Sequence, residues 1–419
     1  MSRSDTPLNP REAALGRAHL EADLEARIRA LVDRGVTVVD RRQTYVGPEV
    51  EPRRITAGVV LYPGTRLEGA ETFLGAGVRV GTEGPAVIVD SALAEGAEVA
   101  SGYVRGAVLL RGAKLGANAH VRPGTLLEEQ ASTAHCVGLK QTILLPFVTL
   151  GSLINFCDCL MSGGTSRRDH SEVGSGFIHF NFTPWGERGD KATPSLIGEV
   201  TRGVFLRERR IFLGGSAGLV GPSEVGFGAI AGAGQVLRRD VGEGAFVLRG
   251  SKPIERVVRP GFRDRMQPRL GKNIRFVAQL FALREWYRAV RLPRLDAADP
   301  ERIPIAAGLA VIEAAIAERD RQLARFVVER GGLAPHFDLG LELPACPLSV
   351  HTDQHDQHDQ HDQHDQHDQH DQHDQHDQHD QHDQNDHIEW VRALSPEAVA
   401  AGQAWLEAVV EAVVVAASA

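Results

Sequence analysis

Aromatic residues are scarce in this chain, whereas small residues are abundant. Phe, Trp and Tyr make up 5% of its 419 residues, and glycine alone contributes 44. Hydrophobic residues still reach 42%, which is in the range of a soluble globular protein. We therefore expect a thin core filled by small side chains. The length predicts two or three structural units.

Cysteine is also rare, and its spacing excludes two kinds of site. The four cysteines are too few and too unevenly spaced for a disulfide framework. Cys157 and Cys159 lack the second pair that a zinc site would need. We predict that the cysteines are buried, reduced thiols and that the chain carries no metal site. The four residues are Cys136, Cys157, Cys159 and Cys346.

The chain has no run of basic residues and no apolar leader. Its formal net charge is −9, and no stretch resembles the electrostatic footprint of a nucleic-acid-binding protein. The N-terminus lacks a signal-peptide core, and the final segment WLEAVVEAVVVAASA is too short and too acidic to cross a bilayer. These features predict a cytoplasmic protein without nucleic-acid or membrane partners.

What the sequence does have is an apolar residue at every sixth position over three stretches. Such a period fits neither a helix nor a continuous strand, but it is typical of a solenoid of short strands and tight corners. Sharp corners need small residues, which explains the glycine content. The hexad positions are Ile55, Leu61, Leu67 and Phe73, then Leu109, Leu115, Val121, Leu127, Thr133, Leu139 and Leu145, then Leu213, Leu219, Val225, Ala231 and Leu237.

The periodicity divides the chain into a mainly β part and a helical part. The hexads predict a parallel β-helix, and a helical period follows them, which could cap the last coil. The His-Asp-Gln repeat holds 12 of the 18 histidines, and we favour a disordered linker over a metal store. The expected units are 1–50 (helix and lead-in strand), 51–250 (hexapeptide-repeat β-helix), 251–345 (α-helical), 351–387 (disordered repeat) and 388–419 (C-terminal helix).

Several segments resemble a known family in their order and spacing. The family is the bifunctional enzyme that acetylates glucosamine-1-phosphate and then uridylylates it, and the likeness is to its C-terminal acetyltransferase half. No glycine-rich nucleotide loop of the other half is found, because YPGTRLEG lies within the hexad register. The matching segments are LVDRGVTVVDRRQTYVGPEV, VLYPGTRLEGAETFLG, HVRPGTLLEE, HFNF…KATPSLIGE and IFLGGSAGLVGPSEVGFGAIAGAGQVLRRDV.

The resemblance implies a fold, an assembly and a ligand set. It implies a left-handed β-helix, although the general rule for parallel crossovers favours the right hand. It also implies a homotrimer with acyl-transfer sites between neighbouring prisms. Acetyl-CoA or another acyl-CoA would lie along a glycine-rich groove near Gly214, Gly215 and Ala233. The acceptor would be a phosphorylated amino sugar or a nucleotide sugar.

The resemblance also assigns substrate-binding residues. Arg122 and Lys140 match the phosphate-binding arginine and lysine of the family. Asn181 matches a substrate-site asparagine, Lys191 matches a loop lysine, and Asn155 stands where the family has a tyrosine. These five residues form the expected substrate-binding set.

The family's catalytic histidine is replaced by Ser152, whose hydroxyl cannot take a proton at neutral pH as an imidazole can. His179 is the best candidate for a replacement base, because His179 and Asn181 are two apart on a strand and should share a face. His135 and His170 are weaker candidates. A histidine zinc site across a trimer, as in β-helical carbonic anhydrases, has no clear ligand trio here.

The segment GFIHFNFTPWGERGDKATPSL interrupts the small apolar repeats. We interpret it as a loop excursion near 183–195 that carries polar groups over a cleft between subunits, with Trp185 as its buried anchor. Two functions remain open. One is an acyltransferase of amino-sugar-phosphate or UDP-N-acetylglucosamine metabolism. The other is a non-catalytic sugar-nucleotide-binding scaffold or regulatory subunit for a separate nucleotidyltransferase.

Overall fold

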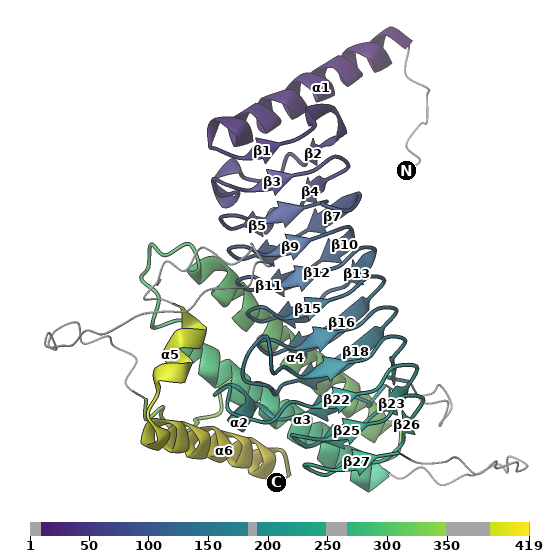
Figure 1. Cartoon of the computed structure of the whole chain (residues 1–419), viewed down its shortest axis with the longest axis vertical. Helices are drawn as coiled ribbons and strands as arrows, with labels where there is room; N and C mark the ends of the chain where they lie inside the picture. Colours follow the sequence, from purple (N-terminus) through teal and green to yellow (C-terminus); the bar gives the residue numbers. More distant parts are fainter. Residues whose placement is uncertain (1–9, 183–190, 249–265, 349–385, 419) are drawn as a thin grey trace, which may run out of the picture.

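The protein is a stack of short parallel strands with helices along one side (Figure 1). The structure is a computed structural model, and it describes residues 10–182, 191–248, 266–348 and 386–418. The strands are mostly two or three residues long and pair in register with strands of the coils before and after them. The predicted left-handed parallel β-helix followed by helices is confirmed, and the right-hand rule does not apply to it.

The strands form three ladders, which we number by the order in which the chain visits them. Ladder 1 contains β1 (Thr37–Val38), β3 (Val60–Leu61), β6 (Arg79–Val80), β9 (Glu98–Val99), β12 (Lys114–Leu115), β15 (Ser132–Thr133), β17 (Thr149–Leu150), β19 (Glu172–Val173), β22 (Phe212–Leu213), β25 (Ile230–Ala231) and β27 (Phe246–Val247). Ladder 2 contains β2 (Tyr45–Val46), β4 (Arg66–Glu68), β7 (Ala86–Val89), β10 (Gly102–Arg105), β13 (Ala119–Val121), β16 (Gly138–Leu144), β18 (Asn155–Met161), β20 (Ile178–Phe180), β23 (Gly218–Val220) and β26 (Val236–Leu237).

Ladder 3 shares two long strands with ladder 2. Strands β16 and β18 continue around the corner, so their C-terminal halves pair within ladder 3. The other members of ladder 3 are β5 (Phe73–Leu74), β8 (Ala92–Leu93), β11 (Ala107–Leu109), β14 (Thr125–Leu127), β21 (Ser195–Ile197) and β24 (Glu224–Val225).

The hexad residues point into the prism, where they form one continuous apolar core. Two positions of the predicted register are wrong by one residue. Leu74 and Leu144 are the inward residues, whereas Phe73 and Leu145 point outward and are buried beneath the helices. Both sites have adjacent apolar residues, so the sequence pattern alone does not tell which one faces the core.

The helices cover two different parts of the solenoid. Helix α1 (Pro10–Asp33) contacts the first coil, where Ile28 and Leu31 join the interior core and cover the open end. Among the described residues, the C-terminal helices pack beside the solenoid rather than across its last coil, since α4 lies along ladder 3 against β8, β11 and β14. The remaining helices are α2 (Val200–Gly203), α3 (Met266–Trp286), a π-helical turn η3 (Tyr287–Arg291), α4 (Arg302–Val328), α5 (His387–Ala393), α6 (Pro396–Ser418) and two 3₁₀ turns, η1 (Arg41–Gln43) and η2 (Pro52–Arg54).

A second core joins ladder 3 to these helices. Leu126 and Ile143 are outward residues of the solenoid and are 0% and 2% exposed, because α3 and α4 cover them. Burial of this size stabilises a protein by roughly 1.5–3 kcal/mol for each large aliphatic side chain. Ladder 3 is therefore an internal interface of the chain, whereas the described parts of ladders 1 and 2 carry no such cover.

The segment 388–419, expected as one C-terminal helix, forms two helices, α5 and α6. The 23 residues of α6 are long and apolar enough to cross a membrane by length and composition. In the structure α6 lies against α3, and residues such as Trp405, Leu406 and Val409 are buried in the second core. This packing buries 33% of the most apolar window of α6.

Candidate functional site

Two basic side chains stand on neighbouring coils of ladder 2. Arg122 directly follows β13, and its backbone N–H donates to the carbonyl oxygen of Leu139 at 3.0 Å, which aligns Arg122 with Lys140 on the next coil. Both side chains point outward, and neither forms an ion pair with any residue that the structure describes. Uncompensated cations on one face attract anions, so this arrangement is suited to a phosphate group.

Below them lie a thiol and an amide. Lys140 pairs with Cys157 in the parallel register. Arg122 Nη2 donates to Cys157 Sγ at 3.6 Å, and Cys157 Sγ donates to Asn155 Oδ1 at 3.1 Å. Burial raises the pKa of the Cys157 thiol, and the charge of Asp158 adds to this effect, so Cys157 is a neutral thiol near pH 7. The thiol therefore connects Arg122 to Asn155 and is not a reactive nucleophile.

An exposed histidine completes this surface, and the sequence analysis missed it. His120 in β13 is two residues before Arg122, so both side chains leave the same face of the strand. Its ring stacks on Tyr103 with centroids 5.6 Å apart. Opposite His120 on the next coil is Gly138, followed by Asn155 on the coil after that. Since glycine has no side chain, it leaves room between His120 and Asn155. We call Arg122, Lys140, His120 and Asn155 the basic wall.

His179, the predicted base, lies inside the prism. It pairs with Leu219 and occupies the inward column of ladder 2, where it is 2% exposed. Its Nδ1 donates to the carbonyl oxygen of Cys157 at 2.6 Å, and its Nε2 accepts from Ser195 Oγ at 2.8 Å. Burial lowers the pKa of His179 from 6.5 to about 4. Both ring nitrogens are occupied within the protein, so this geometry does not support a general-base role for His179.

Asn181 is held by a buried ion pair rather than facing the basic wall. Asn181 Nδ2 donates to Asp158 Oδ2 at 2.5 Å, and Arg319 Nη2 of α4 binds Asp158 Oδ1 at 2.8 Å. Asp158 and Arg319 are each 6% exposed. The expectation that His179 and Asn181 share a face does not hold, because His179 is in the inward column and Asn181 lies beyond the end of β20.

The other predicted site residues are placed as follows. Lys191 is exposed at the start of the chain that follows the undescribed residues 183–190, which include Trp185. His135 is exposed at a corner, and His170 Nδ1 donates to the carbonyl oxygen of Arg167 at 2.8 Å. Among the described residues no cluster of His, Cys, Asp and Glu could hold a metal ion.

The predicted acyl-CoA residues share one corner between ladders 1 and 2. Gly234 N donates to the carbonyl oxygen of Gly215 at 2.9 Å, so Gly215 and Ala233 lie on stacked coils. A Cβ at Gly214 would approach the backbone N of Ala233 to 2.5 Å, which explains why glycine is needed there. Ser152 lies at the same corner two coils earlier, and its N–H donates to Ser175 Oγ at 3.1 Å. The corner is smooth and poor in side chains, as an extended ligand would require.

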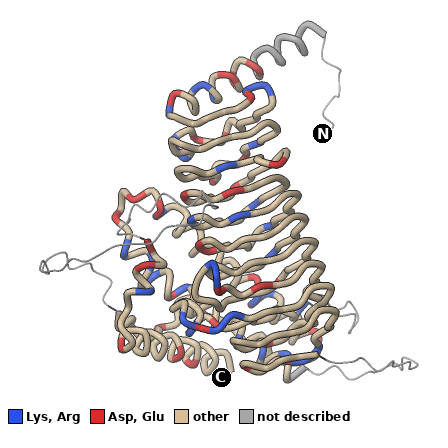
Figure 2. Tube along the Cα trace, viewed as in Figure 1, with Lys and Arg blue, Asp and Glu red and all other residues tan. Residues whose placement is uncertain are grey.

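Charged residues of both signs are spread along the solenoid and the helices (Figure 2). The basic wall is therefore a local feature within a mixed surface. Its two cations have no carboxylate partner among the described residues, unlike Arg66 and Arg79 on other coils, which pair with Glu68 and Glu98.

Known proteins with similar sequences agree with the family resemblance. No family model matches the chain. A protein named bifunctional protein GlmU from Fervidobacterium nodosum is 31% identical over 238 residues, which are 57% of this chain and 47% of that protein. GlmU proteins from Thermus thermophilus and Nocardia farcinica are 34% and 30% identical and cover 55% and 57% of this chain.

The chain spans less than half the length of these relatives, since the matched regions are 46% of the Thermus protein and 43% of the Nocardia protein. The likeness therefore concerns one part of each relative. Together with the parallel β-helix, it confirms the resemblance that the sequence motifs indicated, and this chain is similar to part of the bifunctional GlmU proteins.

Proposed function

We propose that this protein transfers an acyl group from acyl-CoA to a phosphorylated amino sugar or nucleotide sugar in the metabolism of UDP-N-acetylglucosamine. The single observation that carries the proposal is the alignment of two cations, Arg122 and Lys140, on adjacent coils of ladder 2, where neither has an ion pair with a described residue. The similarity to GlmU proteins supports the same substrate class. We expect the protein to act in the cytoplasm.

The proposed reaction joins an amine to a thioester. The guanidinium of Arg122 and the ammonium of Lys140 bind the phosphate and so fix the acceptor on the basic wall. The amine nitrogen attacks the thioester carbonyl, the C–N bond forms, and the C–S bond breaks to release the CoA thiolate. A base must remove the proton that the amine loses, and the thiolate takes up a proton on leaving.

His120 is the base that the geometry favours over His179. Its imidazole is exposed and shares a face with Arg122, and it forms no hydrogen bond with the described residues. An acceptor whose phosphate is bound by Arg122 and Lys140 can place its amine in the space over Gly138, next to the ring of His120. The side chain of Asn155 borders the same space and can donate to a sugar hydroxyl.

The corner at Gly214, Gly215 and Ala233 is our proposed path for the acyl-CoA chain. It runs along the edge that ladder 2 shares with ladder 1, so the thioester would approach the acceptor from that edge. We keep Asn181 and Lys191 as proposed contacts of the acceptor, on the resemblance alone. In the described structure Asn181 donates to Asp158 instead.

A homotrimer is part of the proposal. The outward column of ladder 1 changes from charged residues such as Lys114 to Phe212, Ile230 and Phe246, which are 38%, 45% and 67% exposed on the last three coils. Such contiguous apolar exposure marks a protein interface. Since α3 and α4 already cover ladder 3, the copies would meet through ladders 1 and 2. Sedimentation should give a trimer that Phe246→Asp dissociates, and a monomer at all concentrations would contradict this assembly.

The alternative is a non-catalytic scaffold for a separate nucleotidyltransferase. Ser152 at the position of the family's histidine and the internal location of His179 favour it. It keeps the basic wall as a binding site for UDP-N-acetylglucosamine but predicts no turnover. The two functions therefore differ in one measurable property, which is the release of CoA.

The deciding experiment follows CoA release from acetyl-CoA with glucosamine-1-phosphate and related amino sugar phosphates. The proposal predicts turnover that falls at least about a hundredfold in kcat for His120→Gln, the scale of general-base catalysis, with little change in KM. The control is His135→Gln, which alters an exposed histidine at a corner outside the basic wall. Binding without CoA release for any acceptor would reject the enzyme and leave the scaffold.

A further inference from the structure

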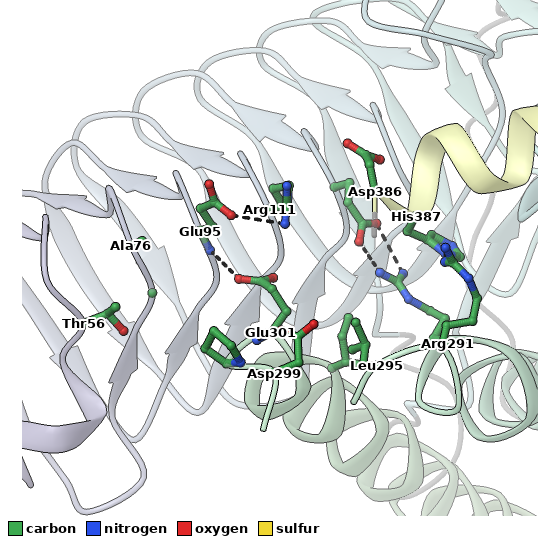
Figure 3. A pocket seen from close by; sticks show the side chains of 15 residues that line it. Thr56, Ala76, Glu95, Arg111, Arg291, Leu295, Asp299, Glu301, Asp386 and His387 are labelled. Atoms are coloured by element: carbon green, nitrogen blue, oxygen red, sulfur yellow. Dashed lines mark hydrogen bonds and ion pairs between the residues drawn. The ribbon is translucent and has the colours of Figure 1, made fainter. Parts of the chain in front are cut away.

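A second cavity, distinct from the basic wall, lies where the solenoid meets the C-terminal helices (Figure 3). Its volume is about 310 Å³. One wall consists of corner residues that follow the strands of ladder 3 on successive coils, including Ala76, Glu95 and Arg111. The other wall comes from the end of the π-helical turn, the segment before α4 and the start of α5. Ligand sites are frequent at such junctions of two structural units.

Carboxylates dominate the end of the cavity near Glu95. Glu95 pairs with Arg111 at 3.1 Å, while its backbone N–H donates to Glu301 Oε1 at 3.1 Å. Figure 3 shows Glu95, Arg111, Glu301 and Asp299 together on this side. Burial raises the pKa of Glu301, and the charges of Glu95 and Glu129 add to that effect. This end therefore carries negative potential that Arg111 does not fully offset, and it favours a cationic group.

The opposite end carries a guanidinium that forms no direct ion pair among the described residues, and the carboxylate of Asp386 lines the same end. Arg291 is buried against Glu128 and Glu129, so its charge is compensated. Arg294 has no ion pair with any described residue; its Nη1 lies 3.4 Å from His387 Nδ1, and its guanidinium stacks 4.4 Å from the centroid of the Trp390 ring. Burial and the charge of Arg291 lower the pKa of Arg294 to about 10, and the charges of Asp386 and Glu129 offset part of this shift. A partly buried guanidinium of this kind favours an anionic group.

We infer that this cavity binds a small zwitterion, a molecule with a primary ammonium group at one end and an anionic group at the other. The ammonium group would face Glu301 and Glu95, and the anionic group would face Arg294. The side chains of Leu295 and Ile305 also line the cavity and suit a short apolar spacer between the two charges. A ligand bound in this way would tie the solenoid to the helices.

The opposite charges at the two ends of the cavity favour a zwitterion over a singly charged anion or amine. A simple anion would be attracted by Arg294 but repelled by the carboxylates at the other end, and a simple amine would meet the reverse problem. A zwitterion of matched length avoids both repulsions. The separation of its charges is therefore the property that the cavity should select.

The test uses a series of ω-amino acids in which only the spacer changes. Glycine, 4-aminobutyrate and 6-aminohexanoate would be titrated into the full-length protein by isothermal calorimetry, with n-butylamine and butyrate as singly charged controls. We expect one member of the series to bind at least about tenfold more tightly than either control. It should also raise the midpoint of thermal unfolding, because a ligand that binds only the folded state stabilises it.

Variants locate the binding. Arg294→Gln and Glu301→Gln should each weaken the best zwitterion by at least about tenfold, since each removes one charged contact. Arg288→Gln is the matched control, because Arg288 lies in the π-helical turn just before Arg294 but pairs with Glu313 and does not line the cavity. Equal binding of butyrate and 4-aminobutyrate, unchanged binding in both cavity variants, or no binding of any member up to about 10 mM would each overturn the inference.

Discussion

The outward sides of ladder 2 and ladder 3 belong to the same coils but have opposite roles. On ladder 3, Leu126 and Ile143 are apolar and covered by the protein's own helices. On ladder 2, Arg122 is exposed and Lys140 is partly exposed, and both lack ion pairs with described residues. The inward residues of both ladders are mostly apolar, with His179 in ladder 2 as an exception. The inward residues thus form the core of the β-helix. The outward residues determine whether a face packs against helices or stays exposed to a ligand.

We expect the largest loss of stability from breaking the ion pair that connects the two faces. Arg319 of α4 reaches across to Asp158, which in turn holds Asn181. Arg319→Ala leaves the carboxylate of Asp158 buried without its partner and should lower the free energy of unfolding by about 3–5 kcal/mol. Urea unfolding measures this change.

The double variant Asp158→Asn with Arg319→Leu is the control for that prediction. It removes both charges and should recover most of the lost stability. If Arg319→Ala costs less than about 1 kcal/mol, the ion pair does not fasten the helices to the solenoid, and the connection between the faces is weaker than the structure indicates.

The next prediction compares the loss of stability caused by one substitution on each face. Leu126→Ala empties a site between β14 and α4 and should cost about 2–5 kcal/mol, because a fully buried leucine leaves a cavity. Arg122→Ala on the open face should change the free energy of unfolding by less than about 0.5 kcal/mol. Similar losses for the two variants would mean that ladder 2 is also covered in the folded protein.

A smaller effect concerns the histidine inside ladder 2. Because burial lowers the pKa of His179 from 6.5 to about 4, the unfolded chain binds the proton more readily than the folded one. The contribution of His179 to the free energy of unfolding is complete above pH 6.5 and is lost as the pH falls from 6.5 towards 4. At pH 5 the loss is about 2 kcal/mol. Glu128, whose pKa burial raises to about 7, acts in the opposite sense as the pH rises.

The variant His179→Leu separates these two contributions. Leucine fits the inward column, where Leu219 is the neighbour, and it does not titrate. Between pH 7 and pH 5 the stability of wild type should fall by about 2 kcal/mol relative to the variant. Parallel stability curves for the two proteins over this range would show that His179 does not titrate as a buried group.

The fold could be predicted from the sequence because each coil is a local repeat. An apolar residue every six positions leaves few alternatives to a β-solenoid. The register failed only at Phe73 and Leu145, where a second apolar residue adjoins the inward one. The face covered by helices could not be predicted, because contacts such as that of α4 with β11 join segments far apart in the chain.

The candidate site was predictable in part, for the same reason. Arg122 and Lys140 align because the coils repeat, and His120 could have been found from its alternation with Arg122. The prediction for His179 relied on its spacing of two residues from Asn181. Nothing local reveals that His179 lies in the inward column or that Cys157 and Ser195 satisfy both of its ring nitrogens. Asn181 donates a hydrogen bond to Asp158, which pairs with Arg319. These residues are far apart in the chain, so no local sequence pattern predicts the contact.

The most direct test of the central claim is the equilibrium binding of glucosamine-1-phosphate to wild type, Arg122→Ala, Lys140→Ala and the control Lys114→Ala. Lys114 is an exposed lysine on ladder 1, away from the basic wall. The open face of ladder 2 predicts that the first two variants bind about tenfold to a hundredfold more weakly, while the control binds like wild type. Equal affinity in all four proteins, or a loss in the Lys114 variant alone, would show that the phosphate does not bind at ladder 2.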